Sequence, residues 1–236
     1  MSLAFGHPHR HYRITDSTNA RARELAEWGA PGGLVVTAQE QSAGRGRRGR
    51  SWFGAPGGAL LYSALLRPLD ERPLLPLAVP LAVCEAAERL APVRCQVKWP
   101  NDVWVRSRKV AGVLIEGRPE ARDGGWAVIG VGLNVSVPAE SFPQELRQTA
   151  ISLDGGGGLE EALRELNAAL GAWLDRDAAD VLAAFRERDA LHGRSISWRG
   201  GSGTAAGIDD DGHLLVDTGD GSRAVLGAGE VHLGLD

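Results

Sequence analysis

The chain has 236 residues, 43% of them hydrophobic, which is enough to build one main domain with a full core and one minor unit. Its formal net charge of −4 argues against whole-surface attraction to nucleic acid or to an anionic membrane, so any anion-binding site must be local. No secretory leader opens the chain, and its longest apolar run, PLLPLAVPLAVC, is short and broken by Pro76 and Pro80. We therefore expect a cytoplasmic protein that does not cross a membrane.

The N-terminal part predicts a strand, a helix and two further strands. HPHRH, residues 7–11, reads as a frayed end, and HYRIT reads as the first strand. The helix follows over DSTNARARELAEWG, with Asp16, Ser17 or Thr18 as its cap and Gly29 as its stop. The strand GLVVTAQEQ then leads directly into QSAGRGRRGRSW, and the next strand is GALLYSALLRP.

The middle of the chain predicts one helix followed by strands. The helix is entered near Pro80 and carries Leu81, Cys84 and Ala87 toward the core; Cys84 and Cys95 lack metal spacing and should be buried, reduced thiols. The strand VRCQVKW comes next. PNDVWVRSRKVAGVLIEG then predicts two strands with a turn near residues 107–109, and WAVIGVGLNVSV a further strand.

The C-terminal part changes character. GGLEEALRELNAALGAWLDRD and AADVLAAFRERDALHG predict two amphipathic helices, and from about Arg194 short strands alternate with Gly- and Asp-rich turns. This pattern is typical of a small β-barrel. The expected fold class is α+β: a mixed sheet flanked by helices over residues 1–190, and a small C-terminal barrel domain over residues 191–236.

The arginine loop, residues 41–52, places Arg45, Arg47, Arg48 and Arg50 among three glycines. Glycine lets a backbone approach a ligand closely, and guanidinium groups fork onto carboxylate or phosphate oxygens, so the loop reads as an anion cradle. It does not match the P-loop pattern G-x-x-x-x-G-K-[ST]. A solvated basic loop and a patch for nucleic acid remain the alternatives.

Two further motifs contain the only lysines among 26 basic residues. KWPND joins Lys98 to a turn at Pro100 and ends on Asp102, which either holds Mg²⁺ together with ligand phosphates or is an ordinary turn residue. RKVAG places Lys109 on the same hairpin. In GVGLNV, Asn134 is the only polar side chain of an apolar segment, so it should pair with a base edge or with the backbone.

Taken together, STN (17–19), EQSAGRGRRGRSW, VKWPNDVW, RKVAGVLIE and VIGVGLNV resemble the biotin protein ligase family, in that order and at similar spacing. The resemblance implies a catalytic domain like that of class II synthetases, followed by an SH3-like barrel. It also implies a reaction in which biotin and ATP form biotinyl-5′-AMP, whose biotin passes to one lysine of the biotin carboxyl carrier domain of a carboxylase. Mg²⁺ would be the metal, and the protein a monomer or a homodimer that acts on no nucleic acid.

The resemblance also implies roles for individual residues. Catalytic roles fall to Lys109, Asp102, Arg45 and Arg47, with Asp102 either as the Mg²⁺ ligand or in the chemistry of the acceptor lysine. The biotin-binding set is Ser17, Thr18, Asn19, Gln41, Arg45, Gly46, Arg47, Lys109 and Gly112. The ATP-binding set is Arg45, Arg47, Arg48, Arg50, Trp52, Lys98, Asn101, Asp102, Lys109, Asn134 and Ile151. The loop is expected to order on binding and to shield the mixed anhydride from water.

Two departures from the family limit these implications. About ten residues precede the first strand, so we expect no DNA-binding domain and no repressor activity. A tryptophan that stacks on adenine in some members has no counterpart in RQTAISL, so aliphatic side chains such as Ile151 should take its place. The nearest alternative function is lipoate or octanoate ligation; a nucleic-acid-binding module is the alternative from another class.

Overall fold

A seven-stranded mixed sheet forms the centre of the computed structural model, which describes residues 4–69, 72–121, 124–154, 158–227, 229 and 231–233. The strand order is β1-β2-β3-β7-β6-β5-β4, in which β1 and β2 pair in parallel and every other pair is antiparallel. The strands are β1 (His9–Thr15), β2 (Val35–Gln41), β3 (Ala59–Leu66), β4 (Cys95–Lys98), β5 (Asp102–Val105), β6 (Arg108–Arg118) and β7 (Trp126–Asn134).

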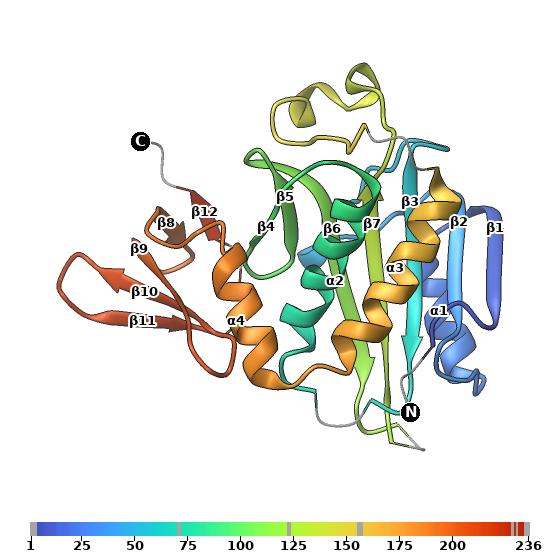
Figure 1. Ribbon diagram of the computed structural model, residues 1–236, viewed down its shortest axis with the longest axis horizontal. Coiled ribbons are helices and arrows are strands. Elements are labelled where there is room, and N and C mark those ends of the chain that lie inside the picture. Colours follow the sequence, from blue (N-terminus) through green and yellow to red (C-terminus); the bar gives the residue numbers. More distant parts are fainter. Residues whose placement is uncertain are drawn as a thin grey trace.

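Helices cover both faces of this sheet (Figure 1). On one face, α2 (Leu75–Leu90) and α3 (Leu159–Leu174) pack on each other and on the sheet, over the largest hydrophobic cluster of the protein. On the other face, α1 (Thr18–Glu27) buries Ala22 and Ala26 against Leu65 in a smaller cluster. On this face the α1 helix contacts β2, β3 and β7.

The C-terminal part follows α4 (Ala178–Arg188) and forms a five-stranded antiparallel sheet beside the β4 edge of the large sheet (Figure 1). Its order is β11-β10-β9-β8-β12, with β8 (Ser195–Trp198), β9 (Gly201–Ile208), β10 (Leu214–Thr218), β11 (Arg223–Leu226) and β12 (Val231–Leu233). Leu214 and Val231 belong to the same hydrophobic cluster as α2. The all-β tail is thus present and shares its core with the α/β part, and the boundary at residue 190 stays a prediction.

Three short 3₁₀ turns complete the secondary structure: η1 (Arg47–Gly49), η2 (Ala139–Ser141) and η3 (Gln144–Leu146). The last two lie in the connection between β7 and α3. None of the described helices is both long and apolar enough to cross a membrane.

Two local predictions were wrong. The α2 helix begins at Leu75 and contains Pro80, rather than starting there. A proline inside a helix costs about 3 kcal/mol, but each buried Leu or Val contributes about 1.5 to 3 kcal/mol, and Leu75, Leu77 and Val79 are all buried. The HPHRH segment is not a frayed end either, because β1 begins at His9.

Candidate functional site

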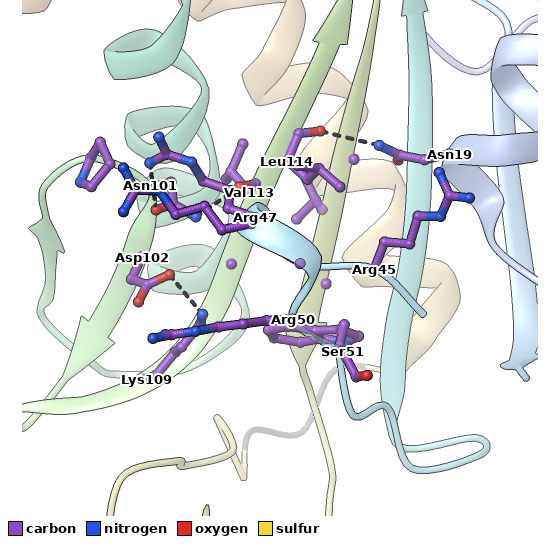
Figure 2. Close-up of a pocket in the computed structure, with 18 of the residues that line it drawn as sticks. Asn19, Arg45, Arg47, Arg50, Ser51, Asn101, Asp102, Lys109, Val113 and Leu114 are labelled. Carbon is purple, nitrogen blue, oxygen red and sulfur yellow. Dashed lines mark hydrogen bonds and ion pairs between the residues drawn. The ribbon is translucent and has the colours of Figure 1, made fainter. Parts of the chain in front are cut away.

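A cavity lies on the α1 side of the large sheet, under the arginine loop (Figure 2). It collects segments that are far apart in the sequence: the start of α1, the end of β2, the arginine loop, the β4–β5 turn, and the facing strands β6 and β7. Its lining includes fifteen of the seventeen residues predicted for the site: Ser17, Thr18, Asn19, Gln41, Arg45, Gly46, Arg47, Arg48, Arg50, Trp52, Lys98, Asn101, Asp102, Lys109 and Gly112.

The floor of the cavity is made by glycines on two paired strands. Gly112 lies opposite Gly132, and Gly130 lies opposite Leu114. A Cβ atom on Gly132 would come within 2.2 Å of the Trp52 ring, and one on Gly130 within 2.1 Å of Asn19 Oδ1. The missing side chains are therefore what allow Trp52 and Asn19 to lie flat against the sheet.

Hydrogen bonds fix the polar wall of the cavity at the start of α1. The Thr18 backbone N–H donates to Gln41 Oε1 over 2.7 Å, and the Thr18 hydroxyl oxygen lies 2.8 Å from the hydroxyl oxygen of the fully buried Ser63. Ser63 also donates to Asn19 Oδ1 over 2.6 Å. The Thr18 hydroxyl also donates to Gln41 Oε1 over 3.2 Å, so hydrogen bonds connect Gln41, Thr18, Ser63 and Asn19.

The arginine loop is a closed turn. Arg45 forms an antiparallel bridge with Ser51, and the Gly46 N–H donates to the Arg50 carbonyl over 2.7 Å. Arg48 adopts a positive φ of 55° inside this turn. Figure 2 shows the guanidinium groups of Arg45 and Arg47 on opposite sides of the loop, the first toward Asn19 and the second toward Asn101.

Side chains from β6 and from the β4–β5 turn hold the loop. Arg47 Nη1 donates to Asn101 Oδ1 over 3.2 Å, and Asn101 Nδ2 donates to the Val113 carbonyl over 2.9 Å. Arg45 Nη1 lies 4.0 Å from Glu116 Oε1. The loop therefore places positive charge over the cavity, as the sequence predicted for an anion cradle.

Lys109 and Asp102 form an ion pair across the β5–β6 hairpin, with 2.7 Å between Nζ and Oδ1 (Figure 2). The ammonium of Lys109 also lies over the Trp52 ring, 5.4 Å from its centroid. Lys98 instead faces the ring of Trp104, 5.3 Å away. The two lysines of the chain thus both reach the cavity, and Lys109 is held there by a carboxylate that also lines it.

Asn134 and Ile151 do not line the cavity; they contact each other beside it. Asn134 Nδ2 donates to the Ile151 carbonyl over 3.1 Å. The backbone is one of the two partners that the sequence left open for this side chain. The Asn134 Oδ1 atom is buried without a hydrogen-bond partner among the described residues. Ile151 N–H donates to the Lys109 carbonyl over 2.9 Å, so this segment runs along the strand that carries Lys109.

Several residues of the site were not foreseen. Ser63, Glu116, Gly130 and Gly132 lie on β3, β6 and β7, and their roles depend on which strands pair. From the C-terminal sheet, Gly229 and Val231 reach the cavity lining. Of these residues, only Glu116 could have been noticed in the sequence, because it is a charged residue inside the otherwise apolar strand VLIEG.

The chemistry of the lining bears on the expected metal. Asp102 is the only acidic residue among the described residues that line the cavity, and its Oδ1 is paired with Lys109. Mg²⁺ commonly takes one or two carboxylates together with phosphates of the ligand. One carboxylate beside an anion cradle fits that pattern.

Comparison with known proteins agrees with this geometry. Residues 11–134 match the family model described as "Biotin/lipoate A/B protein ligase family", and residues 201–234 match "Biotin protein ligase C terminal domain". The chain belongs to the biotin/lipoate A/B protein ligase family.

Several relatives carry the name of a biotin ligase or of a ligase/repressor. The chain is 36% identical to biotin–[acetyl-CoA-carboxylase] ligase of Mycobacterium tuberculosis, over 92% of this chain and 85% of the relative. It is also 36% identical to the enzyme of that name from Paracoccus denitrificans, over 93% and 98%. The bifunctional ligase/repressor BirA of Escherichia coli is 33% identical, over 93% and 72%.

Solved structures show the same fold. The biotin protein ligase of Aquifex aeolicus in complex with biotin and ATP matches with a TM-score of 0.81 at 28% identity, covering 97% of this chain and 99% of that one. The biotin protein ligase of Leishmania major in complex with biotinyl-5-AMP matches with a TM-score of 0.65 at 26% identity, covering 93% and 98%.

Proposed function

We propose that this protein is an ATP-dependent biotin protein ligase, which activates biotin as biotinyl-5′-AMP and transfers it to a lysine of a biotin carboxyl carrier domain. The observation that carries the proposal is the meeting of the arginine loop with the Lys109–Asp102 pair over one glycine-floored cavity. Family membership and the relatives with biotin ligase names support the same reaction.

The first step joins two anions. A biotin carboxylate oxygen attacks the α-phosphorus of ATP, and the bond from that phosphorus to the bridging oxygen of pyrophosphate breaks. Little covalent chemistry is asked of the protein, so positioning and charge neutralisation supply the catalysis. Lys109 and Arg45 are the cations proposed for this role, while Arg47 is proposed to hold the loop over the adenylate. Mg²⁺ bound by Asp102 would neutralise phosphate charge.

Asp102 acts on this step through Lys109. A lysine side chain has four rotatable bonds, and an ion pair at 2.7 Å restricts the position of its ammonium. The face of Trp52 restricts it from another direction. Lys109 is thereby presented to the cavity as a fixed charge, which is what a reaction without a nucleophilic side chain requires.

The biotin end is proposed to lie at the start of α1. Biotin is largely apolar with one ureido group, which suits a strand-lined cavity with a few polar anchors. Thr18 and Gln41 offer such anchors. The Thr18 hydroxyl oxygen has two lone pairs, and after it accepts from Ser63 one remains for a ligand N–H.

The adenine end is proposed to lie at the Lys109 side of the cavity, next to the segment where Asn134 and Ile151 contact each other. The Asn134 Oδ1 atom is a buried acceptor without a partner among the described residues, and such an atom costs free energy until it receives a donor. The exocyclic amino group of adenine is such a donor. Ile151 would supply the apolar contact to the base.

In the second step the ε-amine of the acceptor lysine attacks the carbonyl carbon of biotinyl-5′-AMP, and the carbonyl–phosphate oxygen bond breaks to release AMP. The attacking amine must lose a proton. Asp102 is the only carboxylate that lines the cavity in the described part of the chain, and it is our candidate for accepting it.

Exchange of labelled pyrophosphate into ATP tests the substrate. Exchange that depends on biotin, and not on lipoate or octanoate, is expected. Exchange with lipoate alone would make the protein a lipoate ligase, and no exchange with any of these acids would refute the proposal. Transfer is then measured with the isolated biotin carboxyl carrier domain of acetyl-CoA carboxylase as acceptor.

A further inference from the structure

Glu116 lies on β6 beside the cavity, and its two carboxylate oxygens face different groups. Oε2 accepts a hydrogen bond from Asn19 Nδ2 over 2.8 Å, while Oε1 lies 4.0 Å from Arg45 Nη1. The side chain is 29% exposed, so water screens it only in part.

The Asn19 contact sets the direction of this carboxylate. Asn19 is itself fixed, because its Oδ1 accepts from Ser63 over 2.6 Å and its Nδ2 also donates to the Leu114 carbonyl over 3.3 Å. Flipping the amide would place its oxygen against the Leu114 carbonyl and the Glu116 carboxylate, both of which are acceptors only. A chain of hydrogen bonds therefore runs from the buried Ser63 to Glu116.

The Arg45 contact lies at the base of the arginine loop. Arg45 forms the bridge with Ser51 that closes the loop. The other side of the loop is held by Arg47, through Asn101, to the Val113 carbonyl. Both sides are thus attached to β6, at positions 113 and 116, on the strand that also carries Lys109.

We propose that Glu116 is a positioning residue, which holds Arg45 and with it the arginine loop over the cavity. At 4.0 Å the ion pair is weak, so Glu116 restrains Arg45 and still leaves its guanidinium N–H groups available to an anionic ligand. The inference rests on the proposed function, which supplies the anionic ligand of the loop. That ligand is an acyl adenylate, or the carboxylate and the phosphate from which it forms.

Limited trypsin digestion of the ligand-free protein tests the positioning without any activity assay. Trypsin cleaves after arginine, and the loop offers Arg47, Arg48 and Arg50 in every variant used. In Glu116→Gln the amide oxygen still accepts from Asn19, so only the charge that faces Arg45 is lost. Glu27→Gln is the matched control, because Glu27 pairs with Arg118 over 3.3 Å at a site that does not line the cavity.

We expect E116Q to raise the cleavage rate within the loop about two- to fivefold, the effect of losing a partly exposed ion pair, and E27Q to leave it unchanged. In the background of Arg45→Gln, E116Q should have no further effect, because its partner is gone. Unchanged cleavage in E116Q, an equal increase in both backgrounds, or an equal increase at arginines outside the loop would each overturn the proposal.

A second readout uses the loaded enzyme. The half-life of bound biotinyl-5′-AMP, measured by chase with unlabelled biotin and ATP, should shorten two- to fivefold in E116Q and remain unchanged in E27Q. An unchanged half-life in E116Q counts against the positioning role. If the wild-type protein forms no adenylate, the proposed function fails, while the digestion still decides whether Glu116 holds the loop.

Discussion

Lys109 and Asp102 form the shortest link between the two lysine-bearing motifs, a 2.7 Å ion pair that spans the β5–β6 hairpin. In the sheet, Asp102 of β5 pairs with Lys98 of β4 on one side and with Gly112 of β6 on the other. The β4–β5–β6 meander therefore brings a carboxylate, an ammonium and a glycine floor to one end of the cavity. This arrangement explains why the motifs occur at their particular spacing.

The two lysines should differ in importance. Lys109→Ala removes a fixed cation from the cavity and leaves Asp102 unpaired, so adenylate formation should fall about 100-fold, the loss typical of one preorganised electrostatic group. Lys98→Ala loses a contact with the Trp104 ring and should cost less than tenfold. Single-turnover adenylation rates measure the difference, and equal rates in the two variants would contradict it.

Arg47→Gly should uncouple retention of the intermediate from its synthesis. The change removes the hydrogen bond to Asn101 but leaves Lys109 and Asp102 intact. Adenylate synthesis should remain largely intact, while the adenylate dissociates faster because one side of the loop is detached. A chase experiment on the purified complex measures this, and a wild-type dissociation rate would refute the prediction.

Gly130→Ala should disturb the biotin end of the cavity. A methyl group there would lie 2.1 Å from Asn19 Oδ1, and Asn19 is held by hydrogen bonds on both sides. The expected cost is about 1 to 3 kcal/mol of unfolding free energy, as for overpacking in a core, together with a raised KM for biotin. Gly219→Ala is the control, because an added Cβ meets nothing within 4 Å there. Equal behaviour of both variants would show that the floor tolerates a side chain.

Glu88 and Arg188 tie α2 and α4 to β4, the strand that leads into KWPND. The guanidinium contacts both carboxylate oxygens, at 2.6 and 2.9 Å, and the Cys95 N–H donates to the same carboxylate over 2.8 Å. Arg188→Met should lower the unfolding free energy at neutral pH by about 2 to 3 kcal/mol, the range for hydrogen bonds to charged groups. Urea unfolding measures the loss.

The stability lost in Arg188→Met should depend on pH. Burial raises the pKa of Glu88, but hydrogen bonds from Arg188 and from the Cys95 N–H outweigh it and hold the pKa below its ordinary value of 4.5. Below that value the unfolded state binds a proton before the folded state does, so this stabilisation is lost as pH falls. The gap in stability between wild type and R188M should therefore narrow below pH 4.5. A gap of constant size down to acid unfolding would contradict this reading.

The strands and turns around the motifs were predictable because their signals are local. Alternating apolar residues, prolines and glycines mark β2, β3 and β5 to β7, and fifteen of seventeen predicted site residues line one cavity. The sequence does not mark β9 as a strand, because GSGTAAGI has small residues and no clear alternation. Its place is set by pairing with β8 and β10 on either side.

The start of α2 and the polar wall of the cavity could not be predicted from the sequence, because both depend on tertiary contacts. Pro80 is a strong local breaker, and only the burial of the flanking leucines overrides it. Ser63 and Glu116 acquire their roles from α1, which meets them across 44 and 97 positions of sequence. No periodicity in the sequence reports contacts of that range.

The closed turn of the arginine loop has a consequence for the entropy of binding. Ordering the backbone of a free residue costs about 1 to 2 kcal/mol, and a disordered loop would have to repay that cost from ligand contacts. Here the Arg45–Ser51 bridge and the bond from the Gly46 N–H to the Arg50 carbonyl already restrict the turn. A ligand then meets a loop that is partly organised beforehand, and more of its contact energy is left to hold the reactive anhydride until an acceptor arrives.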